Sequence, residues 1–394
     1  MRRMKAFLIA VVLSIVTIIG IHYYGINHIA FNPHKMGVWA DDAKFLSREG
    51  IIKNQDKNTI VIFGSSEFEN AKESPYHICN LFQEDTFTPM VIGRGHSQSL
   101  QHAITLASIG NELTNKKVVF IVSPQWFQRK SVLKKSYAVR FSESNYVGML
   151  TNEKIPDDLK KKMIKRTGKL LKGVDDPTLE RVELYNRIFI TKDATLKDKA
   201  VYGIYKTFNQ EKDRLRVIEK AKFRGIEQKA LGTYKEGSYD WAALEAAAEK
   251  EAKADSDNPL YMNQEFYEDN KKLIEKNEGS DSWRKFRKKS KEYDDLRLFL
   301  DVCKSMEIEP MIIIMPNNGY WCDNTDFPKA VREKTYQAIK DVADEYQVKV
   351  TDLSSEEYNP YFFMDCYHVS GKGWVKINEA IYEFYKQDEE KSPN

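Results

Sequence analysis

The chain has 394 residues, of which 42% are hydrophobic and 30% charged, with a formal net charge of +3 at pH 7. These values are typical of a globular protein with a sizeable core. The net charge is too small to indicate a partner by itself.

The four cysteines are Cys79, Cys303, Cys322 and Cys366, and they show neither a CxxC pattern nor a metal-ligand spacing. They therefore indicate neither a zinc site nor a disulfide-rich scaffold, and we expect no metal and no cofactor. A single bridge between Cys322 and Cys366 stays open, because sequence does not fix the geometry that a disulfide needs.

The N-terminus is expected to be a membrane anchor. The run Ala6–Ile26 carries no charge other than a possible one on His22, and roughly 20 apolar residues span a bilayer as a helix. Arg2, Arg3 and Lys5 precede it, so the positive-inside bias predicts a cytoplasmic N-terminus and an extracellular remainder. A cleaved signal peptide is the alternative, although its apolar region is usually shorter, about 7–15 residues. We thus expect residues 1–26 to form a cytoplasmic tip and a single-pass anchor in the cell membrane.

Residues 27–58 are expected to form a polar stalk, and an α/β pattern begins after it. Runs of apolar, often β-branched residues predict five strands, at Thr59–Phe63, Met90–Ile92, Lys117–Val122, Pro310–Met315 and Val348–Thr351. Amphipathic segments predict helices at Glu69–Phe82, Leu100–Ile109, Asp294–Met306, Val331–Tyr346 and Trp374–Tyr385. Alternating strands and helices predict an α/β fold with a parallel sheet covered on both faces, built from residues 59–127 and 292–394.

Residues 128–291 interrupt this pattern as a long helix-rich insertion. Asn115–Val174 holds 15 Lys/Arg against 4 Asp/Glu, and a second basic cluster covers Arg284–Lys291. Such charge is either a solvated helical face or a positive surface that attracts a polyanion. For the second interpretation the candidate residues are Lys160, Lys161, Lys162, Lys165 and Arg166. Nucleic acid is disfavoured as the polyanion by the external location.

A serine follows the first predicted strand in the sequence FGSSEF, Phe63–Phe68. A tight strand-to-helix turn exposes such a hydroxyl near helix-terminal N–H groups, which can hold an oxyanion. The alternative is that Ser65 or Ser66 only caps the next helix.

An Asp–His pair precedes the last helix in the sequence DCYHVSGKGW, which begins at Asp365. A serine hydroxyl needs a base, and His368 has a suitable pKa for this role. A carboxylate such as that of Asp365 holds the imidazole in the correct tautomer. The alternative is a surface Asp–His pair without function.

Two other strand ends offer hydrogen-bond donors. Gly93 and Gly95 follow the second strand, and Gln125 follows the third. With the Ser66 amide, these groups are the candidates for an oxyanion hole, although each could equally serve turn formation.

Together these motifs resemble the SGNH (GDSL-type) hydrolase superfamily. The resemblance implies a flavodoxin-like three-layer α/β/α fold, with Ser66 as nucleophile and Asp365 and His368 as its partners. The sequence departs from the usual pattern at Ser65, where Asp is usual, and at Gln125, where Asn is usual.

Six segments in order (the basic anchor, FGSSE, GRGHSQSLQH, VSPQWF, MPNNGYW and DCYHVSGKGW) are similar to the DltD family of D-alanyl-lipoteichoic acid biosynthesis proteins. This resemblance implies transfer of D-alanine esters to lipoteichoic acid at the outer face of a Gram-positive membrane. It also implies as partners the membrane-bound acyltransferase of the pathway and its small companion protein. Two other functions stay open: an esterase or thioesterase with the same triad, and a non-enzymatic scaffold that binds teichoic acid.

Overall fold

The fold is built on a five-stranded sheet, and all its strand pairs are parallel. The computed structural model describes residues 2–228, 234–280 and 290–387. Within them the strands are β1 (Thr59–Phe63), β2 (Thr88–Ile92), β3 (Lys117–Val122), β4 (Glu309–Ile314) and β5 (Lys349–Asp352). Their order is β2-β1-β3-β4-β5, which is the flavodoxin-like order with its switch point between β1 and β3. The predicted α/β class with a parallel sheet is confirmed, and each predicted strand is present within two residues.

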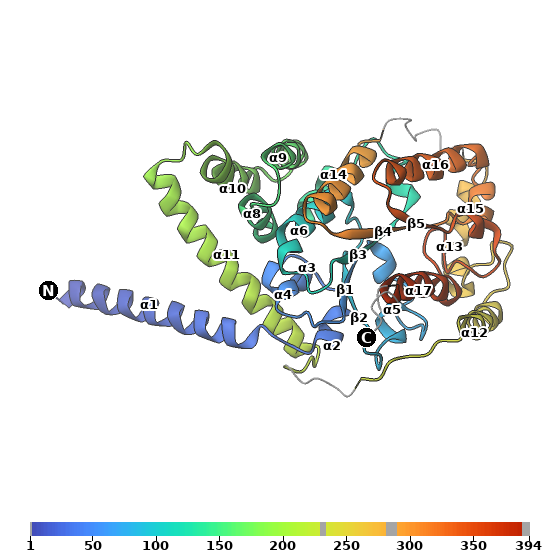
Figure 1. Ribbon diagram of the computed structural model, residues 1–394, viewed down its shortest axis with the longest axis horizontal. Coiled ribbons are helices and arrows are strands. Elements are labelled where there is room, and N and C mark those ends of the chain that lie inside the picture. Colours follow the sequence, from blue (N-terminus) through green and yellow to red (C-terminus); the bar gives the residue numbers. More distant parts are fainter. Residues whose placement is uncertain (1, 229–233, 281–289, 388–394) are drawn as a thin grey trace.

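Side chains that alternate along the strands build a core on each face of the sheet. Val61 and Phe63 of β1 lie in one cluster with α6 and α14, whereas Ile60 and Ile62 lie in the other with α17. Figure 1 shows α6 and α14 on one side of the sheet and α17 with α12 on the other. The sheet is thus the middle of three layers, as strands buried on both faces require.

The helices that surround the sheet fall into three sets along the sequence. Those before and between the first three strands are α1 (Arg2–His28), α2 (Pro33–Gly37), α3 (Asp42–Phe45), α4 (Arg48–Ile52), η1 (Ser66–Phe68), α5 (Ile78–Leu81), α6 (Ser99–Ile109) and η2 (Gly110–Glu112). η3 (Pro124–Trp126) follows β3, and the insertion after it holds α7 (Lys134–Val139), α8 (Glu143–Thr151), α9 (Asp157–Leu171), α10 (Asp176–Asn186), η4 (Arg187–Thr191), α11 (Leu196–Phe223), α12 (Trp241–Ala254) and α13 (Gln264–Asn277). The C-terminal part adds α14 (Glu292–Ser305), α15 (Gly319–Asn324), α16 (Lys329–Glu345), η6 (Ser354–Tyr358) and α17 (Gly371–Lys386).

The helix predicted at Glu69–Phe82 is wrong over most of its length. Only the single turn of α5 is helical there; η1 ends before it, at Phe68, and most of the residues between η1 and α5 form turns or bends. Ala71 has a positive φ of 55°, which interrupts a right-handed helix, and Pro75 lacks the amide that a helix interior needs.

The insertion shares its core with the sheet. Tyr137, Tyr146, Met163 and Tyr185 are buried in the same cluster as Phe120 of β3. Of the second basic cluster, Arg284–Lys291, only residues 290 and 291 are described, and residues 284–289 lie outside the described residues.

Residues 27–58, for which the sequence predicted a stalk, are packed against the body of the protein. Phe31, Met36 and Ala43 form a small buried cluster with Val217 of α11. Asn54 is fully buried and accepts a hydrogen bond from the Phe31 amide at 2.7 Å. The N-terminal helix α1 therefore leads directly into packed structure.

The N-terminal helix α1 projects from the body of the molecule (Figure 1). Among the described residues it is the one helix long and apolar enough to cross a membrane, and none of its most apolar stretch is buried. It contacts the rest of the protein near its C-terminal end, where His22 Nδ1 lies 2.8 Å from Glu211 Oε1.

The bridge considered between Cys322 and Cys366 is not formed. Both residues are free thiols. Burial raises the pKa of the Cys322 thiol to about 12 and also raises that of Cys366, so both stay protonated at neutral pH.

Candidate active site

Ser66, His368 and Asp365 lie in one hydrogen-bonded array. Ser66 begins η1 directly after β1, and the other two lie in the loop before α17. Ser66 Oγ is 2.9 Å from His368 Nε2, and His368 Nδ1 is 2.7 Å from Asp365 Oδ2. The structure thus brings together three predicted site residues that lie up to 302 positions apart.

The hydrogen bonds around Asp365 fix the protonation pattern of the array. Asp365 Oδ1 accepts the backbone amides of Tyr367 and His368, both at 2.7 Å, so its carboxylate acts as an acceptor. Nδ1 of His368 must then donate to Oδ2, which leaves the Nε2 lone pair to accept the Ser66 hydroxyl proton. This is the tautomer in which histidine serves as a base for a serine.

Nearby carboxylates favour the charged form of His368. Burial opposes an imidazolium, but the hydrogen bond to Asp365 and the charges of Asp365, Glu67 and Glu69 outweigh it and raise the pKa of His368. A base with a raised pKa holds the proton taken from serine more firmly.

Glu67 shapes the turn that carries Ser66. It is buried, and its Oε1 accepts the Ser65 amide at 2.6 Å. Ser65 Oγ donates to the Arg94 carbonyl at 3.2 Å and makes no contact with His368. Ser65 is therefore placed to hold the turn, and Ser66 alone presents its hydroxyl to the base.

Glu67→Gln should remove a pH dependence of stability. Burial raises the pKa of the Glu67 carboxyl to about 7, whereas a solvated glutamate titrates near ~4.3. Because the folded pKa is the higher one, the stability contribution of Glu67 is full below about pH 4 and is lost as pH rises through about 7. The unfolding free energy of the variant, relative to that of the unchanged protein, should therefore rise between these pH values in denaturant titrations. Glu73→Gln, at an exposed carboxylate, is the matched control; the same profile for both variants would contradict this role of Glu67.

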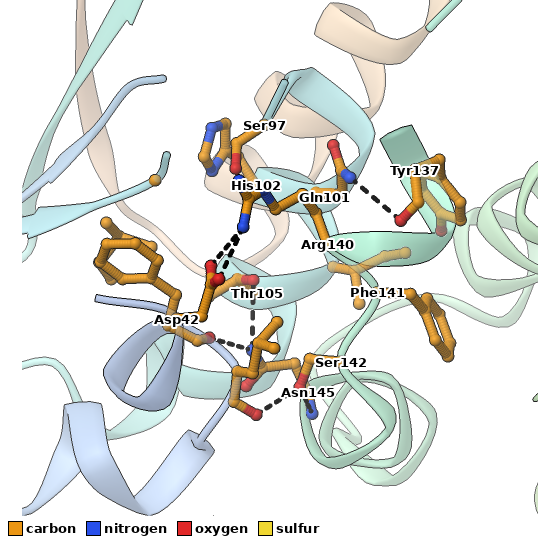
Figure 2. A pocket seen from close by; sticks show the side chains of 15 residues that line it. Asp42, Ser97, Gln101, His102, Thr105, Tyr137, Arg140, Phe141, Ser142 and Asn145 are labelled. Atoms are coloured by element: carbon orange, nitrogen blue, oxygen red, sulfur yellow. Dashed lines mark hydrogen bonds and ion pairs between the residues drawn. The ribbon is translucent and has the colours of Figure 1, made fainter. Parts of the chain in front are cut away.

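The loop after β2 is held against the serine turn by ion pairs. Glu69 accepts the Gly95 amide at 2.7 Å and Arg94 Nε at 2.6 Å. Burial raises the pKa of Glu69, but these bonds and the nearby arginine charges bring it below its usual range. From the insertion, Arg140 donates to the Gly95 carbonyl at 3.0 Å and pairs with Asp42 (Figure 2). The cavity beside this network holds only about 30 Å³, which is too small for an acyl substrate.

The four oxyanion candidates differ in what their donors already bind. The Gly95 amide is bonded to Glu69, so it is not free for an oxyanion here. At Gly93 a Cβ would lie 1.9 Å from the Gly64 carbonyl, and φ is 141°, so only glycine fits. Within the described residues the Ser66 amide and the Gln125 side chain have no hydrogen-bond partner, and Gln125 follows β3 next to β1. The Gly93 amide likewise has no partner among the described residues, so the Ser66 and Gly93 amides and the Gln125 side chain are the donors that remain available.

Two asparagines support the site although no catalytic role was predicted for them. Asn318 Nδ2 donates to the Asp365 carbonyl at 3.3 Å, and Asn317 donates twice to Tyr336 Oη. These asparagines lie in the segment after β4, which the sequence marked only through family resemblance. They support the loop that carries the Asp–His pair.

The five predicted polyanion-binding residues on α9 are not equivalent. Lys160 is buried. Arg166 is bonded to Asp295 through Nε at 2.9 Å and Nη2 at 2.7 Å, and Asp295 is 1% exposed. Arg166 is therefore a structural ion pair within the fold, and only Lys161, Lys162 and Lys165 present exposed charges.

The chain is thus an α/β protein with a five-stranded parallel sheet, and its Ser–His–Asp array lies just beyond the carboxyl end of β1, where open α/β sheets usually hold their sites. The family model described as DltD protein matches residues 42–386. The chain belongs to the DltD family, which takes part in D-alanylation of lipoteichoic acid.

Individual relatives agree with this membership. The chain is 33% identical over 338 residues to Protein DltD of Bacillus subtilis, covering 84% of this chain and 83% of that protein. It is 24% identical to Protein DltD of Staphylococcus aureus over 82% of this chain and 80% of the relative. It is 25% identical to Protein DltD of Lacticaseibacillus rhamnosus over 85% and 80%. The resemblance inferred from the six segments is confirmed.

Proposed function

We propose that this protein is an extracytoplasmic acyltransferase that passes D-alanine to lipoteichoic acid through an acyl-serine intermediate. The observation that carries the proposal is the array of Ser66, His368 and Asp365, with distances of 2.9 and 2.7 Å, in a member of the DltD family. Family membership supplies the pathway, and the array supplies a chemistry that the pathway can use.

The first half of the reaction acylates the serine. Ser66 Oγ attacks the carbonyl carbon of a D-alanyl ester or thioester while His368 Nε2 takes the hydroxyl proton. Asp365 stabilises the resulting imidazolium without taking its proton. The Ser66 amide and Gln125 donate to the oxyanion of the tetrahedral intermediate. When this intermediate collapses, the leaving alcohol or thiol receives the proton from His368, and a D-alanyl ester remains on Ser66.

The second half transfers the acyl group to the polymer. A polyol hydroxyl of lipoteichoic acid attacks the acyl-serine, and His368 takes its proton. The second tetrahedral intermediate collapses to the polymer ester, and His368 returns the proton to Ser66. Water in place of the polyol hydroxyl gives hydrolysis by the same steps.

The test compares the two acceptors directly. The full-length protein in vesicles receives a D-alanyl donor and purified lipoteichoic acid, and both polymer ester and free D-alanine are measured. We expect polymer ester to dominate and mass spectrometry to locate a D-alanyl group on Ser66. Free D-alanine as the main product indicates a hydrolase. Polymer binding without any acyl-enzyme or turnover indicates a scaffold.

We also propose that α1 spans the membrane with its N-terminus in the cytoplasm. Arg2, Arg3 and Lys5 precede its apolar stretch, which supports this orientation. The partners expected there are the membrane-bound acyltransferase of the pathway and its small companion protein.

Protease added to intact protoplasts should digest all of the protein that follows α1 in the sequence. A domain on the outer surface is accessible to an enzyme that does not cross the bilayer. Immunoblots against the C-terminal part measure the loss, and a cytoplasmic protein in the same sample verifies that the protoplasts are intact. Protection until lysis would show the opposite orientation.

The exposed lysines of α9 should contribute to polymer binding. Each basic residue near an anionic surface contributes about 1 kcal/mol, so replacing Lys161, Lys162 and Lys165 with Gln should weaken binding at low salt by up to about two orders of magnitude. The loss should shrink as salt rises, because the Debye length is only ~8 Å at physiological ionic strength. Binding of the full-length protein to purified lipoteichoic acid is measured across a salt series.

The matched control removes the same charge from α13 by replacing Lys271, Lys272 and Lys276, which are also exposed. Equal losses in both triple variants would indicate a general charge effect. Unchanged binding in the α9 variant would make that helix an ordinary solvated face.

A further inference from the structure

Exposed apolar side chains gather on the first half of α11. Leu196 is 85% exposed, Ile204 70%, Phe208 64% and Tyr205 36%. The second half of the same helix instead buries Val217, Ile218 and Ala221, although its last residue, Phe223, is exposed. Tyr205 lies beside the Arg181 guanidinium, 6.0 Å from its ring centroid. Ile204 and Phe208, called the α11 apolar face below, lie on one side of the helix and lack such cover within the described part of the protein.

The α11 apolar face continues the side of the helix that contacts α1. Residues 204, 208, 211, 215, 218 and 222 follow one another at intervals of three or four, which places them along one side of a helix. On this side, Glu211 pairs with His22 of α1, and Lys222 donates to Tyr24 Oη at 2.9 Å. The helix α1 thus covers the C-terminal part of this side of α11. Ile204 and Phe208 form its N-terminal part, which α1 does not cover.

The contacts also show in which direction α11 points. Along α1 from His22 to Tyr24 to His28, the partners advance from Glu211 to Lys222 and then to Gln228 just beyond α11. The two helices therefore run in the same direction. Their N-terminal halves both extend away from the contact on the same side of the molecule, as Figure 1 shows. At 1.5 Å per residue, the 15 residues before Glu211 extend about 22 Å to that side.

The opposite side of this segment is fixed to the protein. Tyr202 packs edge-on against Tyr185 and Phe189, with ring centroids 5.8 and 5.2 Å apart. Thr195 caps the helix through a capping box with Asp198. The α11 apolar face is therefore presented by a supported helix, and its position relative to α1 is set by the fold.

We infer that the α11 apolar face lies against the outer leaflet of the bilayer that α1 spans. The inference rests on the proposed placement of α1 in the membrane. Lipid is the favoured occupant because the face is continuous with the exposed, apolar α1 and projects to the same side. Helical spacing places the exposed Lys199 and Lys206 on the side of the helix away from Ile204 and Phe208, and an apolar side opposed by lysines is typical of helices at the surface of anionic bilayers.

A second membrane contact has a consequence for the active site. An anchor attached at one end alone leaves the domain free to swivel about that attachment. Contact through both α1 and α11 fixes its tilt, because α1 is tied to α11 through His22 and Glu211, and α11 is tied to the body through Arg214 and Glu49. Ser66 is then held at a defined height above the lipid surface, where a membrane-tethered acceptor polymer lies.

The test measures lipid and water exposure at single spin labels. The full-length protein is reconstituted without any partner in vesicles of phosphatidylglycerol and phosphatidylcholine. Labels are placed at Ile204→Cys and Phe208→Cys on the face, at Lys206→Cys as the matched control on the same helix, and at Val16→Cys within α1. The unchanged protein treated with the same reagent gives the background from its own thiols. Collisions with oxygen report lipid, and collisions with a water-soluble nickel chelate report water.

We expect oxygen collisions to exceed nickel collisions at positions 16, 204 and 208, with the reverse at 206. Water exposure at 204 and 208 with lipid exposure at 16 would overturn the inference and leave the anchor intact. Water exposure at 16 would overturn the anchor and the inference together. Shielding of 204 and 208 from both reagents would assign the face to contact between copies of the protein and overturn lipid as its occupant.

Discussion

Ser66→Ala and His368→Ala should each lower D-alanyl transfer by about four to six orders of magnitude, and the double variant should lose hardly more. The hydroxyl is a nucleophile only while His368 Nε2, 2.9 Å away, accepts its proton. Removing either group therefore removes the same step. Asp365→Asn should cost about 10⁴-fold or less, because Asp365 orients and stabilises the imidazole without taking its proton. Rates are measured as polymer ester formed in reconstituted vesicles, with the protein level checked in each variant.

Ser65→Ala is the matched control for the nucleophile. The Ser65 hydroxyl makes one hydrogen bond, to the Arg94 carbonyl, and such a bond contributes about 1 kcal/mol. Its loss should thus cost less than about tenfold in rate. If Ser65→Ala abolishes transfer while Ser66→Ala retains it, the nucleophile is misassigned by one residue. If neither substitution matters while the polymer still binds, the protein acts as a scaffold.

The sheet was predictable because its signal is local. Lys117–Val122 is buried at every position, and a continuous apolar run bounded by turns is what such a strand needs. Glu69–Phe82 lacked a comparable signal, since Asn70, Ser74 and Pro75 favour turns. The fold there follows the needs of the serine turn, in which Asn70 donates to the Ser66 carbonyl at 2.7 Å.

The motifs around Ser66 and His368 could be found in the sequence, but the partners of their neighbours could not. Arg166 pairs with Asp295, 129 positions away, and Arg140 bonds the Gly95 carbonyl across 45 positions. A sequence pattern gives the charge of an arginine but not whether a distant carboxylate neutralises it. For the same reason Gly95 was a reasonable oxyanion donor until the structure showed its amide bonded to Glu69.

A buried ion pair supports the loops that carry the site. Arg332 is fully buried and donates to Glu357 through Nε at 3.1 Å and Nη2 at 3.1 Å. Tyr336 Oη also donates to Glu357, at 2.6 Å, and accepts the Asn317 amide at 2.8 Å. The next residue along the chain, Asn318, donates to the Asp365 carbonyl. Glu357 is thus the common acceptor beneath the segment after β4.

Glu357→Ala should lower the free energy of unfolding by about 3–5 kcal/mol, the usual cost of leaving one partner of a buried ion pair without its counter-charge. Burial opposes the charge on Arg332 while Glu357 favours it and keeps the arginine pKa raised. The variant therefore retains a buried cation whose remaining carboxylate neighbour is the exposed Asp323, 3.6 Å away. Replacing both residues with apolar side chains, Arg332→Met with Glu357→Leu, should recover most of the loss, because it removes the uncompensated charge together with its partner. Denaturant unfolding of both variants in one detergent measures this difference. A double variant as unstable as Glu357→Ala would show that the shape of the pair, and not its charge, stabilises the loops beneath Asp365.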